Sequence, residues 1–176
     1  MQMGRSAADL LQARRARENK QWGMATGLLH FTFLQILLGA LVAGIDAGRS
    51  YTDWPMMGGQ WFPATALSFE PLWRNFFESP GLVQFMHRVT GYALLLFTIV
   101  VWFRGRKSTH PNTRFAFNAV LSAMTLQIVL GVVTVINAAP AHIAIVHQGL
   151  AVIVWVLILR ARFLSGYPIA TSVRGV

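Results

Sequence analysis

Two histidines lie inside long apolar stretches of the sequence, where an ionisable side chain is costly and points to a function. His87 lies five residues after Leu82, and His147 lies five residues after His142, so each is near the start of its apolar stretch. A neutral imidazole is a good axial ligand for haem iron, and helix bundles hold cofactors between facing helices. For either histidine alone, an interhelical hydrogen bond explains the residue as well as ligation does. The pair at one depth favours ligation of a single b-type haem.

Small residues accompany both histidines. Gly91 follows His87 by four residues and Ala151 follows His147 by four, so each lies on the helix face of its histidine. Small side chains there leave space for a flat macrocycle, which adds Gly91 and Ala151 to the predicted haem-binding residues. The alternative is that they let helices pack closely, a common use of small residues in membranes.

Arg88 follows His87 directly, within the same apolar stretch. An unpaired guanidinium is expensive in that position. One interpretation is that Arg88 pairs with a haem propionate near the outer face of the membrane. The other is that it reaches the membrane interface, or pairs with an acid of the outer loop such as Glu78. Both interpretations stay open at this point.

The remaining three histidines are weaker candidates. His30 lies in the inner half of the first apolar stretch without a partner at matching depth. His142 begins the fourth stretch and could be a gate, a proton relay or an interface residue. His110, beside Pro111 in a basic loop, is expected to be solvated. One histidine pair predicts one haem.

Helices must position these residues, because backbone groups in lipid have to pair within their own segment. Four stretches are long enough to cross a bilayer, which takes about 20 mostly apolar residues. They run roughly over Met24–Ile45, Leu82–Phe103, Phe115–Asn137 and His142–Phe163. The prediction is an all-α bundle of four transmembrane helices. Its parts are a basic flank at 1–23, a membrane domain at 24–163 with an outer loop at 46–80, and a tail at 164–176.

The composition indicates that most of the chain lies in a lipid bilayer rather than in water. Hydrophobic residues make up 55% of the chain and charged residues 12%, against roughly 25% charged in ordinary soluble domains. The absence of cysteine excludes disulfides, thiolate metal sites and iron–sulfur clusters. The net charge of +9 comes from basic residues that fall on one side of the four predicted spans. Membrane topology therefore explains the charge, and nucleic-acid binding is not expected.

Orientation follows from the same charges, because cytoplasmic loops carry the excess of Lys and Arg. Both termini are predicted to be cytoplasmic, in a bacterial inner membrane, or in the matrix if the protein is mitochondrial. The Arg-rich N-terminal stretch is interpreted as a cytoplasmic flank of the first helix, with a transit peptide as the alternative.

An internal repeat relates the two halves of the membrane domain. The run 34–39 reads LQILLG and the run 126–131 reads LQIVLG, and the helix after each run contains a histidine, His87 or His147. This pattern predicts two helical hairpins repeated in the same orientation about an axis along the membrane normal. Equivalent residues then lie at equal depth and face each other, which suits two imidazoles on opposite faces of one porphyrin.

The outer loop at 46–80 is longer than a helical hairpin needs, and loops of this size are usually functional or disordered. It contains eight aromatic residues, which is too many for disorder. It is predicted to cap the haem edge, with an aromatic belt at the membrane interface as the alternative.

At this loop the sequence resembles a known family. The run 39–48, GALVAGIDAG, the run 51–58, YTDWPMMG, and the segments NFFE at 75–78, QFMHR at 84–88 and His147–Gln148 are similar to the second half of haem A synthase, the CtaA/COX15 family. The resemblance covers about residues 24 to 163.

The resemblance implies a protein of two four-helix halves, each with a haem between paired histidines. The C-terminal half holds haem b, and the N-terminal half binds haem O and oxidises its methyl to the formyl of haem A. On that basis His87 and His147 become the haem b ligands. The sequence departs from the family because no N-terminal half is present, and because Asp53 replaces a usual Thr. We therefore expect this chain to need an N-terminal catalytic half, or a second copy of itself, for activity.

Two other functions compete with the haem-b half of haem A synthase. A free-standing cytochrome of the b561 type would transfer electrons across the membrane, but it needs a histidine pair near each face. A haem-free scaffold would use the histidines for hydrogen bonds only. The Trp-Pro loop favours the haem A synthase interpretation.

Overall fold

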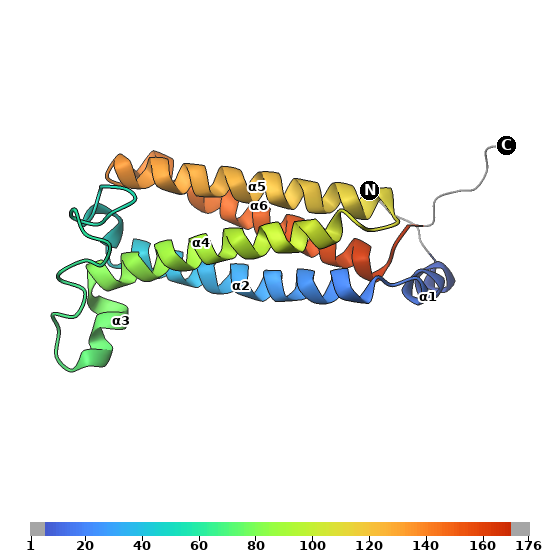
Figure 1. The fold of residues 1–176 in the computed structure, drawn as a ribbon, viewed down its shortest axis with the longest axis horizontal. Helices are drawn as coiled ribbons and strands as arrows, with labels where there is room; N and C mark the ends of the chain where they lie inside the picture. Colours follow the sequence, from blue (N-terminus) through green and yellow to red (C-terminus); the bar gives the residue numbers. More distant parts are fainter. Residues whose placement is uncertain (1–5, 170–176) are drawn as a thin grey trace.

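In the computed structural model, which describes residues 6–169, four long helices form an elongated bundle (Figure 1). Each has 26 residues and is long and apolar enough to cross a membrane. They are α2 (Asn19–Gly44), α4 (Pro80–Gly105), α5 (Pro111–Ile136) and α6 (Ala141–Gly166). The predicted all-α bundle with four membrane-spanning helices is confirmed. Every helix begins one to five residues before its predicted start.

Local chemistry sets the helix starts. Pro80 and Pro111 occupy the first turns of α4 and α5, where the missing N–H of proline costs nothing. The Ser79 side chain caps α4 by accepting a hydrogen bond from the Leu82 backbone N–H. Pro140, with extended backbone, precedes α6. These starts fix the register that places the histidines.

The flank and the outer loop contain short helices of their own. The flank holds α1 (Ala7–Arg15), which ends close to the start of α2. The outer loop holds η1 (Ala47–Arg49), η2 (Leu72–Arg74) and α3 (Asn75–Glu78). Figure 1 shows α3 projecting sideways from one end of the bundle, and α1 at the opposite end. The predicted domain boundaries stay predictions, and residues 1–5 of the flank and 170–176 of the tail lie outside the described residues.

The helices pack as a ring. Helix α2 contacts α4 and α6, and α5 also contacts α4 and α6. Helices α4 and α6 therefore stand on opposite corners of the bundle, and each carries one of the two candidate histidines. This is the arrangement that the repeated hairpins predicted.

In the core of the bundle, burial follows the internal repeat. The buried residues Ala25, Leu28 and Thr32 of α2 correspond to the buried Phe117, Val120 and Met124 of α5, each pair 92 positions apart. The buried residues Leu94, Thr98, Val101 and Gly105 of α4 correspond to Val154, Ile158, Ala161 and Ser165 of α6, each pair 60 positions apart. The same spacings relate the two LQI runs and the two histidines. The hairpins are therefore equivalent in the core, whereas buried residues at the start of α4, such as Val83 and Arg88, have no buried counterparts in α6.

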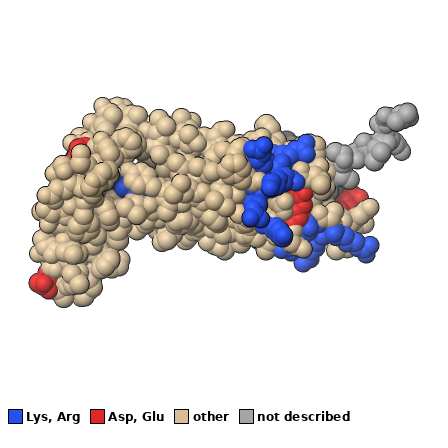
Figure 2. Space-filling model, in the orientation of Figure 1, with Lys and Arg blue, Asp and Glu red and all other residues tan. Residues whose placement is uncertain are grey.

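The main apolar core occupies one half of the bundle's length. It joins all four long helices, from Leu28 and Leu94 toward Ile158 and Leu164. This half leads to the end at which Lys and Arg gather, around α1 and the loop between α4 and α5 (Figure 2). The histidines lie in the other half, near the outer loop. The bundle thus separates an apolar inner half from a more polar outer half.

Candidate functional site

His87 lies against helix α2 in a contact that glycine makes possible. A Cβ atom added at Gly39 would stand 3.1 Å from Cε1 of the His87 imidazole. Gln35, one turn away on the same face of α2, donates from Nε2 to the His87 backbone carbonyl at 2.9 Å. The same amide nitrogen lies 3.1 Å from Nδ1 of the imidazole. Gln35 therefore contacts both the backbone carbonyl and the ring of His87.

His147 has the same environment in the second hairpin. A Cβ atom added at Gly131 would stand 3.0 Å from Cε1 of the His147 imidazole. Gln127 donates from Nε2 to the His147 backbone carbonyl at 3.0 Å, and the same nitrogen lies 3.4 Å from Nε2 of the ring. Each half-site is therefore a histidine on one helix with a glutamine and a glycine on the neighbouring helix.

The two half-sites face one interior. Their histidines come from α4 and α6, which stand at opposite corners of the ring of helices. Between them, Gly91 of α4 approaches both α2 and α5, since a Cβ there would stand 3.2 Å from Gln35 Nε2 and 3.8 Å from Ile128 Cδ1. The space predicted beside Gly91 for a macrocycle thus holds the Gln35 amide. Ala151, its counterpart in α6, is half-buried.

Several polar atoms of the site have no partner among the described residues. Nδ1 of His147, Oε1 of Gln35 and Oε1 of Gln127 are all buried and make no hydrogen bond there. A buried polar group without a partner costs about 1–3 kcal/mol. A buried imidazole nitrogen without a partner, beside glutamine amides at equivalent positions, fits a bound group that takes nitrogen ligands. The donor set also fits haem iron, which histidine nitrogen ligates in proteins.

The Arg88 side chain binds the outer loop. Its side chain, 9% exposed, donates from one terminal nitrogen to the carbonyls of Asp53 and Met56 at 2.9 and 3.0 Å. The other terminal nitrogen donates to the Tyr51 carbonyl at 2.8 Å. Its Nε is buried without a partner among the described residues. Arg88 thus fastens the loop to α4 beside His87.

The expected alternative of an ion pair between Arg88 and Glu78 is wrong. Glu78 pairs instead with Arg74, one helical turn away, at 2.6 Å. Glu78 pairs with Arg74 because both residues belong to the projecting segment around α3, whereas Arg88 faces the loop at 51–56. The Arg74 guanidinium beside Glu78 holds the pKa of that carboxyl below its usual value. The pair is exposed and is expected to contribute little stability.

Two further residues of α4 hold the loop on the same side as Arg88. Gln84, which is buried, donates to the Tyr51 carbonyl at 3.0 Å. Tyr92 accepts a hydrogen bond from the Trp54 indole at 2.8 Å. These residues lie four apart along the helix, so a single stripe of α4 binds the segment 51–56. His87 lies on the adjacent face and points to the interior.

Asp53 closes the tight turn that follows Trp54. Its two carboxylate oxygens accept hydrogen bonds from the backbone N–H groups of Gly58 and Gly59 at 2.8 and 2.9 Å. Both glycines have positive φ, a conformation that favours glycine. The hydrogen bond from Gly59, then that from Gly58, holds the pKa of Asp53 below its ordinary value. An aspartate here therefore uses both oxygens, which a threonine could not.

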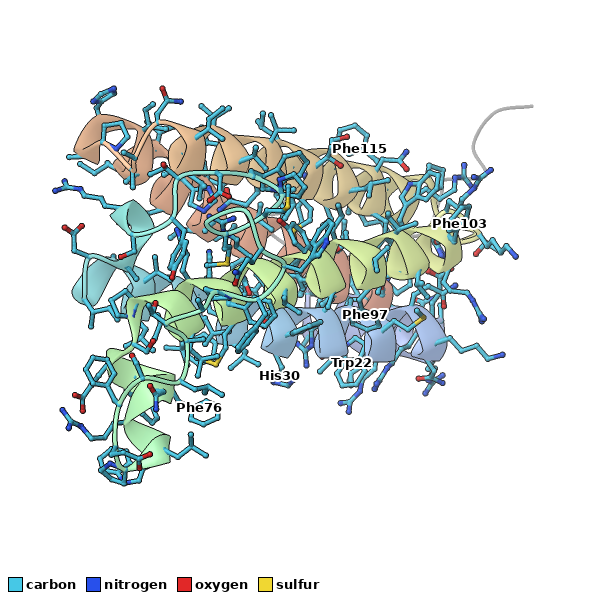
Figure 3. All side chains as sticks on the ribbon, turned by 60° about the vertical axis from the view of Figure 1, so that its left-hand side comes forward. Trp22, His30, Phe76, Phe97, Phe103 and Phe115 are labelled. Carbon is cyan, nitrogen blue, oxygen red and sulfur yellow. The ribbon has the colours of Figure 1, made fainter. Side chains whose placement is uncertain are left out.

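The loop contains short helices and a tight turn, but many of its rings face outward. Trp61 is 75% exposed and Trp73 is 61% exposed. Figure 3 shows Phe76 on the projecting α3 segment, off the side of the bundle, and its side chain is exposed. The segment 51–56 lies over α4 near His87, whereas the segment 72–78 extends to the side. The haem-edge cap and the aromatic belt both stay predictions.

We expect Arg88→Met to loosen this loop. Methionine keeps an unbranched side chain but removes the donors to three carbonyls, and hydrogen bonds from a charged group contribute about 1.5–3 kcal/mol each. Chymotrypsin should cleave the loop several times faster in the variant than in the parent chain. Arg74→Met, which breaks an exposed ion pair, is the control and should change cleavage little. Equal cleavage of all three proteins would contradict the role given to Arg88.

The other histidines lie apart from the site. His30 is exposed, and Figure 3 shows its side chain on the outside of α2. His142 is exposed at the start of α6. The expectation that His110 is solvated is wrong: its Nδ1 lies 3.3 Å from a Glu18 carboxylate oxygen, and its side chain is 19% exposed. The Glu18 carboxylate also accepts hydrogen bonds from the Ser108 hydroxyl, which hold it beside His110.

Sequence reasoning placed the histidines but gave no role to four of their neighbours. These are Gln35, Gly39, Gln127 and Gly131. The signal was present, since glutamine and glycine are the only residues of the repeated six-residue runs that are not aliphatic. A glutamine and a glycine recur at equivalent positions of two apolar helices. This recurrence indicates that both residues contact another helix rather than lipid.

Comparison with known proteins places this site in a family. The family model described as "COX15-CtaA: Cytochrome oxidase assembly protein" matches residues 2–159. The chain belongs to this family. COX15-CtaA proteins that it resembles include a heme A synthase of Roseobacter denitrificans, 85% identical over 99% of the chain. A heme A synthase of Paracoccus denitrificans is 56% identical over 98% of the chain.

The chain spans about half the length of these relatives. It covers 46% of the Roseobacter denitrificans protein and 45% of the Paracoccus denitrificans protein. The matched part is their C-terminal half, as the sequence resemblance implied. No solved structure matches the chain.

Proposed function

We propose that this chain is the haem-b-binding half of a haem A synthase and that His87 and His147 are the axial ligands of one haem b. The observation that carries the proposal is the pair of equivalent half-sites, each built from a histidine, a glutamine and a glycine. Two equivalent imidazoles facing one interior suit the two faces of a planar group. A scaffold that needed only hydrogen bonds would have no reason to repeat the set at equal depth.

The chain's own residues would prepare the ligands in a defined way. A histidine bound through one ring nitrogen usually donates its other N–H to a neighbouring acceptor, which fixes the orientation of the ring. Beside His87 that neighbour is the Gln35 amide, whose Nε2 donates to the His87 carbonyl at 2.9 Å and lies 3.1 Å from Nδ1 of the ring, so Gln35 is placed to hold the ring's orientation. Gln127 contacts the His147 carbonyl in the same way, but it lies beside Nε2 of that ring, and Nδ1 is the nitrogen without a partner among the described residues. Gly39 and Gly131 leave room for the imidazoles to lie against the neighbouring helices.

Arg88 and the apolar core would complete the site. Arg88 binds the segment 51–56 over the outer end of α4, and its unpartnered Nε is available to a haem propionate. The inner core separates the site from the basic end of the bundle. A bound haem would supply one-electron transfer, and by resemblance the complete enzyme oxidises the methyl of haem O to the formyl of haem A. In this proposal the oxidation takes place in an N-terminal half.

The test is a visible spectrum of the purified chain with its haem content. We expect one haem per chain, of b type after extraction, with the low-spin spectrum of two nitrogen ligands. A free-standing electron-transferring cytochrome of the b561 type would instead contain two haems. A chain that purifies without haem, and that binds none when haem is added, would contradict the proposal.

We also propose that both chain termini are cytoplasmic, because Lys and Arg gather at the end of the bundle that holds α1 (Figure 2). The bacterial relatives support a bacterial membrane protein, and our proposal assigns it to the inner membrane. A reporter fused after Val176 should be active only in the cytoplasm, and one inserted between Asp53 and Trp61 only outside it. Two reporters active on the same side would overturn this topology and the count of four spans.

A further inference from the structure

A pocket of about 140 Å³ at the basic end of the bundle is lined by three arginines from two separate parts of the chain. Arg14 belongs to α1, Arg17 follows it, and Arg162 lies in the last turns of α6. Trp22, Gly166 and Tyr167 complete the lining. This pocket lies at the end of the bundle opposite to the histidines and plays no part in the proposed haem site.

The arginines are held close together although their charges are alike. The Arg17 guanidinium lies 3.8 Å from the centre of the Trp22 ring, and the Arg162 guanidinium lies 4.5 Å from the same centre. Arg162 is also fixed by its Nε, which donates to the Thr26 hydroxyl at 2.8 Å. Nε of Arg17 is buried and has no hydrogen-bond partner among the described residues. Two fixed like charges against one ring repel each other, and an anion beside them would offset that repulsion.

No carboxylate among the described residues lines this pocket. The acid next to it in sequence is Glu18, and its carboxylate already accepts hydrogen bonds from Ser108 and from the Thr109 backbone N–H. It also lies 3.3 Å from the His110 ring. Glu18 therefore binds the loop between α4 and α5 and not the arginine pocket. Within residues 6–169, the charge of the arginine pocket is therefore not neutralised by an acid in its lining, and an anion can bind there.

An apolar groove adjoins the pocket and indicates what kind of anion it is. The groove, of about 430 Å³, shares Arg14 and Tyr167 with the pocket and is lined further by Leu10, Leu11 and Phe163. Leu11 is 64% exposed. The groove thus continues from the arginines along apolar side chains of α1 and α6, at the end of membrane-spanning helices. A phosphate with an attached hydrocarbon chain matches both features, whereas a free phosphate uses only one.

We propose that this pocket binds the phosphate of an anionic phospholipid, with an acyl chain in the groove between α1 and α6. Basic pockets at the ends of membrane helices commonly hold such headgroups. Arg14, Arg17 and Arg162 provide the donors, and Leu10, Leu11 and Phe163 cover the hydrocarbon. The bound lipid links α1 to α6 and holds α1 at the membrane surface. The site does not depend on haem binding.

The experiment measures lipid binding by the whole purified chain in a neutral detergent. Phosphatidylglycerol is added, with phosphatidylcholine of the same acyl chains and inorganic phosphate as separate probes. Retained lipid is counted by native mass spectrometry, and the melting temperature is recorded at each concentration. We expect phosphatidylglycerol to be retained and to raise the melting temperature, and the other two probes to do neither. Equal binding of phosphatidylcholine, or stabilisation by inorganic phosphate alone, would overturn the proposal.

Matched variants separate this site from the general positive charge. Each arginine near an anionic headgroup contributes about 1 kcal/mol, so Arg14→Gln with Arg162→Gln should weaken phosphatidylglycerol binding roughly thirtyfold. The control, Arg15→Gln with Arg160→Gln, removes the same charge from the same helices at exposed positions outside the pocket. It should change binding much less than the pocket pair does, because neither Arg15 nor Arg160 lines the pocket. An equal loss in both variants would show that only the overall charge matters.

Two single variants keep the test decisive if the change at Arg162 disturbs packing. Arg14 is exposed, so Arg14→Gln should leave the fold intact and still weaken phosphatidylglycerol binding about fivefold. Leu11→Gln, in the groove, should lower the affinity for phosphatidylglycerol while all three arginines remain. Unchanged affinity in both single variants would contradict the proposed site.

Discussion

Replacing His87 or His147 with alanine is expected to abolish the low-spin haem spectrum of the purified chain. Removing either imidazole leaves the iron with one protein ligand from the pair, so the remaining haem is at best five-coordinate. The loss should be complete in each variant, because the half-sites are equivalent and neither contains a second nitrogen ligand. Visible and electron paramagnetic resonance spectra, with haem content per chain, provide the measurement.

A hydrogen-bonding role for the same histidines predicts a different result. His87→Asn removes the imidazole but keeps a polar side chain for Gln35, which now contacts the ring and the backbone of His87. If His87 only joined helices, this variant would retain the low-spin spectrum. His30→Ala is the control, since His30 lies exposed on the outside of α2 and its loss should leave the spectrum unchanged (Figure 3). An unchanged low-spin spectrum in His87→Ala would rule out the ligand assignment.

The fold could be predicted from the sequence because membrane helices obey strong constraints. Apolar stretches of sufficient length have no alternative to the helix in lipid, and the repeated LQI runs fixed which helices are equivalent. Burial at equivalent positions, such as Leu94 and Val154, then follows from the repeat. The helix ends were less certain, because Asn19 and Pro111 extend their helices into polar sequence.

The partners of charged residues could not be predicted in the same way. Arg88 was assigned either a propionate, the membrane interface or Glu78, yet its terminal nitrogens bind carbonyls of the loop at 51–56. Backbone carbonyls are present at every residue, so sequence gives no sign of which of them a guanidinium will find. The contact of His110 with Glu18 joins residues 92 positions apart through a loop whose course the sequence did not reveal. Long-range polar contacts of this kind depend on the folded path of the loops.

The second prediction with a large effect is that this chain alone does not convert haem O to haem A. Its four helices enclose one interior, and the equivalent half-sites of His87 and His147 face it. A second haem would need a second histidine pair. The remaining histidines lie outside α2, in the loop between α4 and α5, and at the exposed start of α6. No two of these three could bracket one porphyrin.

The measurement uses cells that make haem O but lack a haem A synthase. The chain is expressed in them, and the haems are extracted and separated by chromatography. We expect haem O and haem b and no haem A, whereas the full-length Roseobacter denitrificans relative, expressed as the positive control, should yield haem A. Because that relative is 85% identical over the matched region, its N-terminal half should pair with this chain and restore haem A when both are expressed. Haem A made by this chain alone would contradict the prediction, and would indicate that two copies of the chain pair to build the substrate site.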